Sequence, residues 1–525
     1  MTTGNPVAET NGRDSRWALG GALTLAALLR VASLGVTEVE WWDSTIYLTE
    51  ARRIASGIPW APVYERHRAP LLPWLGALSY GAGFGEAGVY LANVLFSVGT
   101  VWLVCELGEL LFDRRAGLVA AFLTAVSWES LFFTQRVLTE TPALFFWVLA
   151  ILAYAKAVMR GRTAWLPLLG PAVALAFLAH FRAGAIVLAL AVHFVAAGKW
   201  RLLRSREVLV SALLGLLGLA AYVAFSTRRW GAPFELLRSY QVLRLRSIGT
   251  AQLGVFLRYL EYLPSYLGGF LFALLLVSLA IALSASIRSS AARGEPASRA
   301  EGPHRGLLLA GLVLVPLAMP SLFEKFHHRL GILCLPALFL VLGAAVSRLA
   351  ASARTRSAVV ARALVAGALA IAASQQLSTA DEWLRAEGLS YLSVKEAGLR
   401  VRERSAEGAL IVTTSWPQVN YYAERPTADV PGTAGEFEAL VRERRAPLLV
   451  LSDYERQPAW LGPYLAENAA RLPLVFQTGD VRGLQTRVYD CSGLGGDVRG
   501  RELGRVGDPG AGRRFRGLGD GGGSS

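Results

Sequence analysis

The chain has 525 residues, of which 53% are hydrophobic and 18% are charged, and its mean hydropathy is +0.40. This composition excludes an ordinary soluble globular protein, because too few polar side chains remain to cover its surface. The net charge of +14 does not indicate binding to nucleic acid, since the basic residues fall in short clusters between hydrophobic segments. We therefore expect an integral membrane protein in contact with membrane lipids.

Hydrophobic runs of spanning length predict a polytopic α-helical protein with about eleven transmembrane helices. The first run, at residues 17–36, is as long as a spanning helix, so we interpret it as an uncleaved span and not as a signal peptide. Residues 1–16 then form a short N-terminal tail. The predicted spans are residues 17–36, 88–111, 116–134, 141–158, 164–180, 183–198, 208–226, 264–287, 306–321, 330–347 and 358–378.

Positive charge is concentrated in alternate connections between these runs, for example in residues 199–206 and 288–305. The positive-inside rule assigns such connections to the cytoplasm. The N-terminus is then cytoplasmic, and the loop at residues 37–87 and everything after about residue 380 lie outside. We expect a multi-pass protein of the plasma membrane with an extracytoplasmic C-terminal domain.

The first outer loop opens with EVEWWDSTIYLTEARRIASG, in which acidic, aromatic and basic residues recur at helical spacing. This pattern predicts an amphipathic helix along the outer membrane surface, with Asp43, Tyr47 and Glu50 on one face. In a site shielded from water, such a carboxylate can take a proton from an acceptor hydroxyl that attacks a sugar carbon. The alternative is that Asp43 is a solvated residue of an interfacial helix, paired with an arginine.

Arginine is unusually frequent in the loops that this topology places outside, where the positive-inside rule disfavours it. Guanidinium groups bind phosphate through two parallel hydrogen bonds, so a lipid-linked phosphate on the outer leaflet would account for them. The alternative for any one of these residues is contact with ordinary lipid headgroups. The arginines that we assign to a phosphate site are Arg66, Arg68, Arg136 and Arg329.

Two outer junctions carry further candidates. Glu140 directly precedes Thr141 and Pro142, which are predicted to be the N-cap and first turn of a span, although such a carboxylate can also simply complement the helix dipole. His180 and Arg182, on the same side, are either headgroup anchors or part of the site. At the second junction two adjacent histidines diverge on a helix, so contact with phosphate is favoured over metal binding. Its residues are His327, His328 and Arg329.

The composition changes after about residue 381, where polar and apolar segments alternate. Three segments are strand candidates, and EFEALVRERR between the first two is a helix candidate, which predicts a small α/β domain over residues 381–491. Residues 492–525 are rich in glycine and arginine and hold too few apolar residues to fold, so we expect a disordered tail. The strand candidates are residues 409–415, 446–454 and 472–479.

The order of three motifs resembles a known superfamily. WWDSTIYLTEARRI in the first outer loop, HRAPLLPWL after it and LTETPALFFWVLAIL at the opening of a later span resemble the GT-C superfamily of polytopic glycosyltransferases. The resemblance is to the protein O-mannosyltransferase and aminoarabinose-transferase-like branch in particular, and HHRLGILCLPALFLVLG is similar to the basic outer junction before a late span in that group. The resemblance covers residues 17–380, with the α/β domain similar to the extracytoplasmic C-terminal domain of many members.

The resemblance implies an inverting transfer of a hexose or pentose from a dolichyl- or undecaprenyl-phosphate donor to a protein, lipid or glycan acceptor at the outer membrane face. Asp43 and Glu140 would be the catalytic residues: Asp43 the first-loop carboxylate and general base, and Glu140 the second acidic position, where many relatives have aspartate. No cofactor is certain, and a divalent cation is left open. The residues expected to bind substrate are Tyr47, Glu50, Arg66, Arg68, Arg136, His327, His328 and Arg329, of which Arg66, Arg68 and Arg329 would hold the donor phosphate.

Two other classes of function compete with an enzyme. A transporter or flippase of a lipid-linked or anionic substrate would also need many spans, but it should place charged or helix-breaking residues inside spans of paired halves. A sugar or lipid receptor would not require Asp43. Because the ionisable residues concentrate at the outer ends of the spans and no repeat is visible, the sequence favours an enzyme at the membrane surface.

Overall fold

The computed structural model describes residues 6–36, 39–62, 64–66, 68–235, 238, 251–291, 301–321, 326–352 and 355–494. The chain divides into two compact units. We call residues 1–37 with 64–387 the membrane unit, and residues 38–63 with 388–525 the C-terminal unit.

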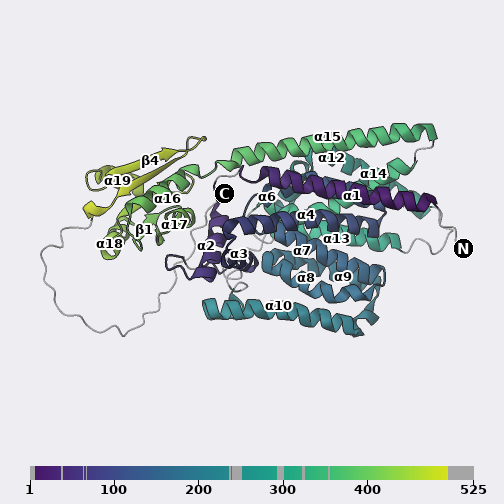
Figure 1. Cartoon of the computed structure of the whole chain (residues 1–525), viewed down its shortest axis with the longest axis horizontal. Coiled ribbons are helices and arrows are strands. Elements are labelled where there is room, and N and C mark those ends of the chain that lie inside the picture. The colour runs from purple at the N-terminus through teal and green to yellow at the C-terminus, as the bar shows by residue number, and fades with distance from the viewer. Residues whose placement is uncertain are drawn as a thin grey trace. The chain divides into compact units, whose positions relative to one another are not determined.

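Helices form almost all of the membrane unit. In Figure 1, α4, α7, α8 and α10 run side by side, and consecutive members of this set pack against one another. Every predicted span falls on a helix of the structure. The helices are α1 (Pro6–Ser33), α3 (Leu71–Gly81), α4 (Gly85–Leu111), α5 (Arg114–Val126), α6 (Trp128–Thr134), α7 (Glu140–Tyr154), α8 (Leu166–Ala179), α9 (Ile186–Ala197), α10 (Arg206–Trp230), α12 (Ala251–Ala291), α13 (Glu301–Ser321), α14 (Leu335–Ser352) and α15 (Thr355–Gly388).

The membrane-spanning capacity of these helices follows from their length and composition. Among the described residues, seven helices are long and apolar enough to cross a bilayer, and eight if the bent pair α5 and α6 is one span. The helices α8 and α9 are apolar but shorter. The helical character of the predicted spans is confirmed, whereas the number of about eleven crossings stays a prediction.

The chain bends by 51° at Ser127, between α5 and α6, and a buried arginine stabilises the bend. A bend leaves carbonyl groups at the end of the first helix without their usual helical donors. Here the guanidinium of Arg30 donates to the carbonyl of Ala125 at 2.8 Å and to that of Thr124 at 3.4 Å, and also to the hydroxyl of Ser130 at 2.8 Å. Arg30 is fully buried, so it fixes the start of α6 from inside the bundle.

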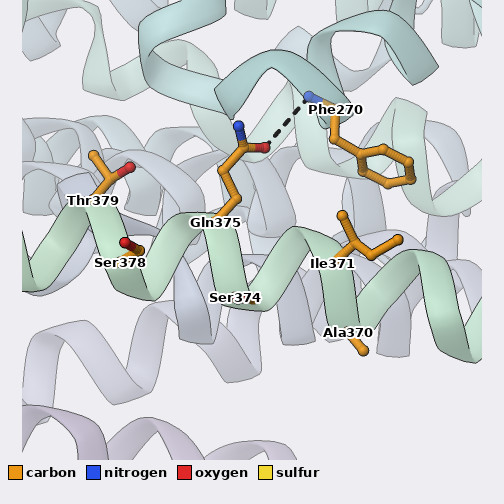
Figure 2. Close-up of a pocket in the computed structure, with 7 residues that line it drawn as sticks. All are labelled: Phe270, Ala370, Ile371, Ser374, Gln375, Ser378 and Thr379. Atoms are coloured by element: carbon orange, nitrogen blue, oxygen red, sulfur yellow. Dashed lines mark hydrogen bonds between the residues drawn. The ribbon is translucent and has the colours of Figure 1, made fainter.

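A second irregularity is the break in α12 at Gly268, whose φ of 73° is a backbone conformation that favours glycine. Gln375 of α15 accepts a hydrogen bond from the backbone N–H of Phe270 at 3.3 Å, as Figure 2 shows. Gln376 donates to the carbonyl of Leu267 at 2.8 Å. Two adjacent glutamines thus satisfy backbone groups that the break frees. An open groove with a cavity volume of about 720 Å³ lies beside it, lined by Phe270, Ala370, Ile371, Ser374, Gln375, Ser378 and Thr379.

The C-terminal unit is built on a five-stranded sheet in the order β2-β1-β3-β5-β4. The strands β2, β1 and β3 are parallel, whereas β5 is antiparallel to both β3 and β4. The three predicted strands are confirmed as β1, β3 and β4. The strands are β1 (Ile411–Thr413), β2 (Thr427–Asp429), β3 (Leu448–Ser452), β4 (Leu474–Gly479) and β5 (Gln485–Asp490).

Helices cover both faces of this sheet because alternate residues of β3 point to opposite sides. Leu449 and Leu451 pack with helices α18 and α19, and Leu448 and Val450 pack with helices α16 and α17. The predicted helix EFEALVRERR is confirmed as part of α18. The helices are α16 (Leu392–Arg404), α17 (Trp416–Ala423), α18 (Ala434–Arg444) and α19 (Leu461–Glu467).

The units divide the chain differently from the expected domains at two places. The helix α2 (Trp42–Ser56), expected along the membrane surface within the loop 37–87, packs against α17 inside the C-terminal unit. The last membrane-unit helix continues to Gly388, so residues 381–387 do not open the α/β domain. Of the expected disordered tail, residues 492–494 form a short helical turn, and residues 495–525 lie outside the described residues.

Candidate active site

The predicted site residues are divided between the two units. The helix α2 carries Asp43, Tyr47 and Glu50 in the C-terminal unit. The other candidates belong to the membrane unit. They are Arg66, Arg68, Arg136, Glu140, His327, His328 and Arg329.

Asp43 lies in the first turn of α2, where the helix dipole favours a carboxylate. It is partly buried, and Tyr47 is 7% exposed. Glu50 is 2% exposed and accepts two hydrogen bonds, both of 2.6 Å, from Arg53 three residues later. The Glu50 carboxylate also raises the pKa of the Arg53 guanidinium. The negative charge of Glu50 is therefore matched within its own helix.

A narrow pocket in the membrane unit gathers charged residues from three parts of the chain: α7, the segment between α8 and α9, and the turn before α14. Glu140 is the first residue of α7, and Oε1 of Glu140 lies 3.5 Å from Nε of Arg329. The carboxylate is 4% exposed and the arginine side chain 31% exposed. His180 and Arg182 line the same pocket, together with apolar residues of α13 and of the turn η6 (His328–Cys334). Its cavity volume of about 20 Å³ holds about one water molecule.

The start of α7 differs in detail from its prediction. The N-cap is Thr139, without a side-chain capping bond, and not Thr141. Glu140 therefore lies in the first turn, beside backbone N–H groups that have no helical acceptor. The dipole of α7 and the guanidinium of Arg329 therefore both stabilise the carboxylate at the N-terminal end of this helix.

The turn that carries Arg329 is fixed by two tyrosines of α12. The hydroxyl of Tyr259 donates to the carbonyl of His327 at 3.0 Å, and the hydroxyl of Tyr266 donates to the carbonyl of His328. A Cβ atom on Gly331 would lie 2.2 Å from the Tyr266 hydroxyl, so only glycine allows this close approach. Hydrogen bonds from α12 thus hold the backbone of the two residues directly before Arg329.

A second carboxylate, which the sequence analysis missed, lies next to this turn. Glu129 of α6 is fully buried, and its Oε1 is 3.6 Å from Nδ1 of His328. The His328 ring is surrounded by the rings of Phe133, Tyr262 and Trp383, with centroids 5.8 to 6.2 Å away. A carboxylate inside an otherwise apolar predicted span was the available signal, because such residues are costly and so are usually functional.

The remaining predicted cations differ in the solvent exposure of their side chains. Arg136 is 2% exposed and donates to the carbonyl of Glu387 at 3.0 Å, so it helps to close the C-terminal end of α15. Arg68 is 9% exposed and pairs with Glu65. Arg66 pairs with Glu235 at 2.7 Å, but its side chain is 58% exposed.

The arrangement of these side chains suits an anion better than a metal ion. Within the described part of the chain, no group of three or more His, Cys, Asp or Glu side chains is arranged to hold a metal. In contrast, the guanidinium groups of Arg182 and Arg329 line one pocket with a single carboxylate, that of Glu140. Guanidinium groups are suited to phosphate, both in charge and in hydrogen-bond geometry.

A family model matches the first part of the membrane unit. Residues 67–225 match the model described as dolichyl-phosphate-mannose-protein mannosyltransferase. The matched segment contains Glu129, Glu140 and Arg182, and it begins after α2. No curated protein sequence matches the chain.

Solved structures match nearly the whole chain. The apo crystal structure of ArnT from Cupriavidus metallidurans aligns with a TM-score of 0.64 and 14% identity, over 90% of this chain and 98% of that one. The same protein bound to undecaprenyl phosphate aligns with a TM-score of 0.62 and 15% identity, over 92% and 98%. The archaeal oligosaccharyltransferase AglB from Archaeoglobus fulgidus, in complex with an inhibitory peptide and a dolichol-phosphate, aligns with a TM-score of 0.57 and 14% identity, over 90% and 74%.

These matches agree with the fold that the sequence resemblance implied. The chain shares the fold of ArnT and AglB, with a largely helical unit and a small C-terminal α/β unit.

Proposed function

We propose that this chain of GT-C fold is a glycosyltransferase that moves a sugar from a polyprenyl-phosphate donor to an acceptor on the outer membrane face. The observation that carries the proposal is the pocket lined by Arg182, Arg329 and Glu140 at the start of α7, in which Arg329 lies within ion-pair distance of Glu140. The fold adds support, because the ArnT structure that it resembles holds undecaprenyl phosphate and the AglB structure a dolichol-phosphate. The acceptor is a protein, a lipid or a glycan, and the sugar a hexose or a pentose.

The donor phosphate would bind to guanidinium groups of the membrane unit. During transfer the bond between the anomeric carbon and the phosphate oxygen breaks, and its electron pair stays on the phosphate. Arg329 and Arg182 would stabilise this added charge, and Arg66, the most exposed of the predicted cations, would contribute from outside the pocket. Expulsion of lipid phosphate is thus made easier by cations that the fold already holds in place.

Glu140 would act mainly on Arg329. Its carboxylate is buried and lies within ion-pair distance of that guanidinium, so it orients the cation and limits its movement. This role also accommodates glutamate at the position where many members of the resembled group have aspartate.

Asp43 would be the general base. The acceptor hydroxyl attacks the anomeric carbon from the side opposite the phosphate, a new carbon–oxygen bond forms, and the hydroxyl proton passes to the Asp43 carboxylate. Attack from the opposite side inverts the anomeric configuration. The position of Asp43 in the first turn of a partly buried helix supports the proposal, because a base of this kind must be held and shielded from bulk water.

The proposal is tested by a transfer assay on the purified full-length protein in liposomes. The protein is supplied with radiolabelled dolichyl-phosphate or undecaprenyl-phosphate sugars and with membrane extracts as a source of acceptors, and mass spectrometry identifies lipids that copurify with it. We expect label to move from one of these donors to an acceptor in the wild type and not in Arg329→Met. Absence of transfer from every donor, with label instead crossing the bilayer, would favour the transporter or flippase.

A further inference from the structure

We propose that helix α17 of the C-terminal unit supports helix α2 and thereby positions Asp43. The inference rests on the proposed role of Asp43 as general base. It assigns to the α/β unit a part in the chemistry, acting through α2, the helix on which Asp43 lies. The residues of α17 concerned are positioning residues, since none of them is assigned a contact with the substrate.

The segment around α2 is tied to α17 just before Asp43. The backbone N–H of Glu40 donates to the hydroxyl of Tyr422 at 2.7 Å. The ring of Trp42 meets that of Trp416 edge-on, with centroids 5.9 Å apart. These two contacts fix the chain three residues before and one residue before the proposed base.

Further contacts tie the same segment after Asp43. The guanidinium of Arg52 lies 3.4 Å from the carboxylate of Glu424 and 4.7 Å from the ring centroid of Tyr421. The side-chain amide of Asn420 donates to the carbonyl of Trp60 at 2.9 Å. Because residues of one helix keep a fixed rotation relative to one another, holding Trp42 and Arg52 also fixes the direction of Asp43.

Helix α17 is itself firmly held in the core of its unit. Val419 and Ala423 are fully buried against the sheet. Arg425, just beyond the helix, is 7% exposed and donates to the carbonyls of Arg402 and Ser405 at 3.1 and 2.8 Å. Helix α17 therefore moves only together with the whole α/β unit.

The helix α2 needs such support. It has 15 residues, near the lower limit at which an isolated helix is stable in water. Its N-cap, Trp41, makes no side-chain capping bond, so the first turn, which carries Asp43, would fray without outside contacts. The contacts with α17 lie at this turn and at the far end of the helix.

The test removes one hydroxyl group from helix α17. Tyr422→Phe deletes the acceptor of the Glu40 N–H and leaves the ring in place. The matched control is Tyr464→Phe, which removes a hydroxyl that donates to Glu438 at 2.7 Å within the same unit but on α19. We expect kcat to fall on the order of tenfold in Tyr422→Phe, with the donor KM unchanged, and neither to change in the control.

A second readout separates positioning from general stability. Hydrogen exchange of the amides in residues 42–56 should speed up in Tyr422→Phe, while exchange in β1 and β3 stays as in the wild type. If Tyr422→Phe does not fold, Asn420→Ala, which removes the contact with Trp60, takes its place with the same expected results.

The outcomes distinguish failure of this inference from failure of the proposed function. If Asp43→Asn transfers sugar at the wild-type rate, the proposed base is wrong and the contacts between α17 and α2 have no catalytic role. If Asp43→Asn is inactive while Tyr422→Phe keeps the wild-type kcat and wild-type exchange in α2, the role of Asp43 as base is supported and the positioning role of α17 is refuted. Equal loss of kcat in Tyr422→Phe and Tyr464→Phe would also refute it, since general destabilisation would explain both.

Discussion

Replacing Arg329 with methionine tests whether this guanidinium acts on the substrate or only neutralises Glu140. The substitution leaves a carboxylate that is 4% exposed without the cation 3.5 Å away. Removing one partner of a fully buried ion pair costs about 3–5 kcal/mol of stability. Because the Arg329 side chain is 31% exposed, solvent screens part of this interaction, and we expect a loss of about 2 kcal/mol.

The effect on transfer should be larger than the effect on stability. If Arg329 stabilises the charge that develops on the leaving phosphate, its loss should lower kcat by roughly 100- to 1000-fold, the range seen when one such stabilising group is removed. Stability is measured by SDS titration of the solubilised protein, and kcat by transfer in liposomes. The double variant Glu140→Gln with Arg329→Met also removes the buried negative charge of Glu140 and should recover most of the lost stability.

The double variant decides between the two roles. We expect it to be stable but still largely inactive, because the guanidinium of Arg329 is missing from the phosphate site and Arg182 is left as the pocket's remaining guanidinium. Recovery of both stability and activity in the double variant would show that Arg329 serves only to balance Glu140, and the assignment of the pocket to phosphate would be wrong.

Two further predictions concern stability. Arg30→Met should destabilise the membrane unit by about 3 kcal/mol, because it removes the donors of buried carbonyls at the α5–α6 bend, whereas Arg206→Met, at a side chain that is 91% exposed, should change the SDS midpoint little. Equal shifts would contradict this account of the bend. In the C-terminal unit, burial raises the pKa of Glu455 to about 7 from an ordinary value of 4.5, so the unfolded chain loses this proton at lower pH than the folded one. The resulting stability is complete below about pH 4.5 and is lost as pH rises through 7, with a slope of at most about 1.4 kcal/mol per pH unit. Hydrogen exchange of β3 in the full chain should show this slope, Glu455→Gln should abolish it, and an unchanged slope in that variant would refute the assignment.

Much of the membrane unit could be predicted because hydropathy reports directly on residues that must avoid water. Each predicted run falls on a helix, and the motif around Glu140 marks the start of α7 to within two residues. The bend at Ser127 could not be predicted, because it depends on Arg30, which lies about 100 residues earlier in the sequence and has no local signal.

The environment of the site was harder to predict than its residues. The pattern of residues 42–56 correctly indicated a helix. Periodicity did not predict that eight consecutive residues of it, Ser44–Ala51, are buried, nor what covers them, and α17 is too short to stand out in the sequence. Glu129 was overlooked because it lies within the apolar run 116–134, and its partner His328 is about 200 residues away. The pairing of Glu140 with Arg329 likewise depends on the path of the chain between them.

The central claim is that Asp43 takes the acceptor proton in a sugar transfer from polyprenyl phosphate. The most direct measurement is single-turnover transfer from the identified donor by Asp43→Asn, with donor binding measured on the same sample by native mass spectrometry. The variant keeps the size and hydrogen-bonding capacity of the side chain, but its amide cannot serve as the base. We predict that the donor still binds and that transfer slows by at least about 100-fold. Wild-type transfer by a variant that binds the donor normally would contradict the account.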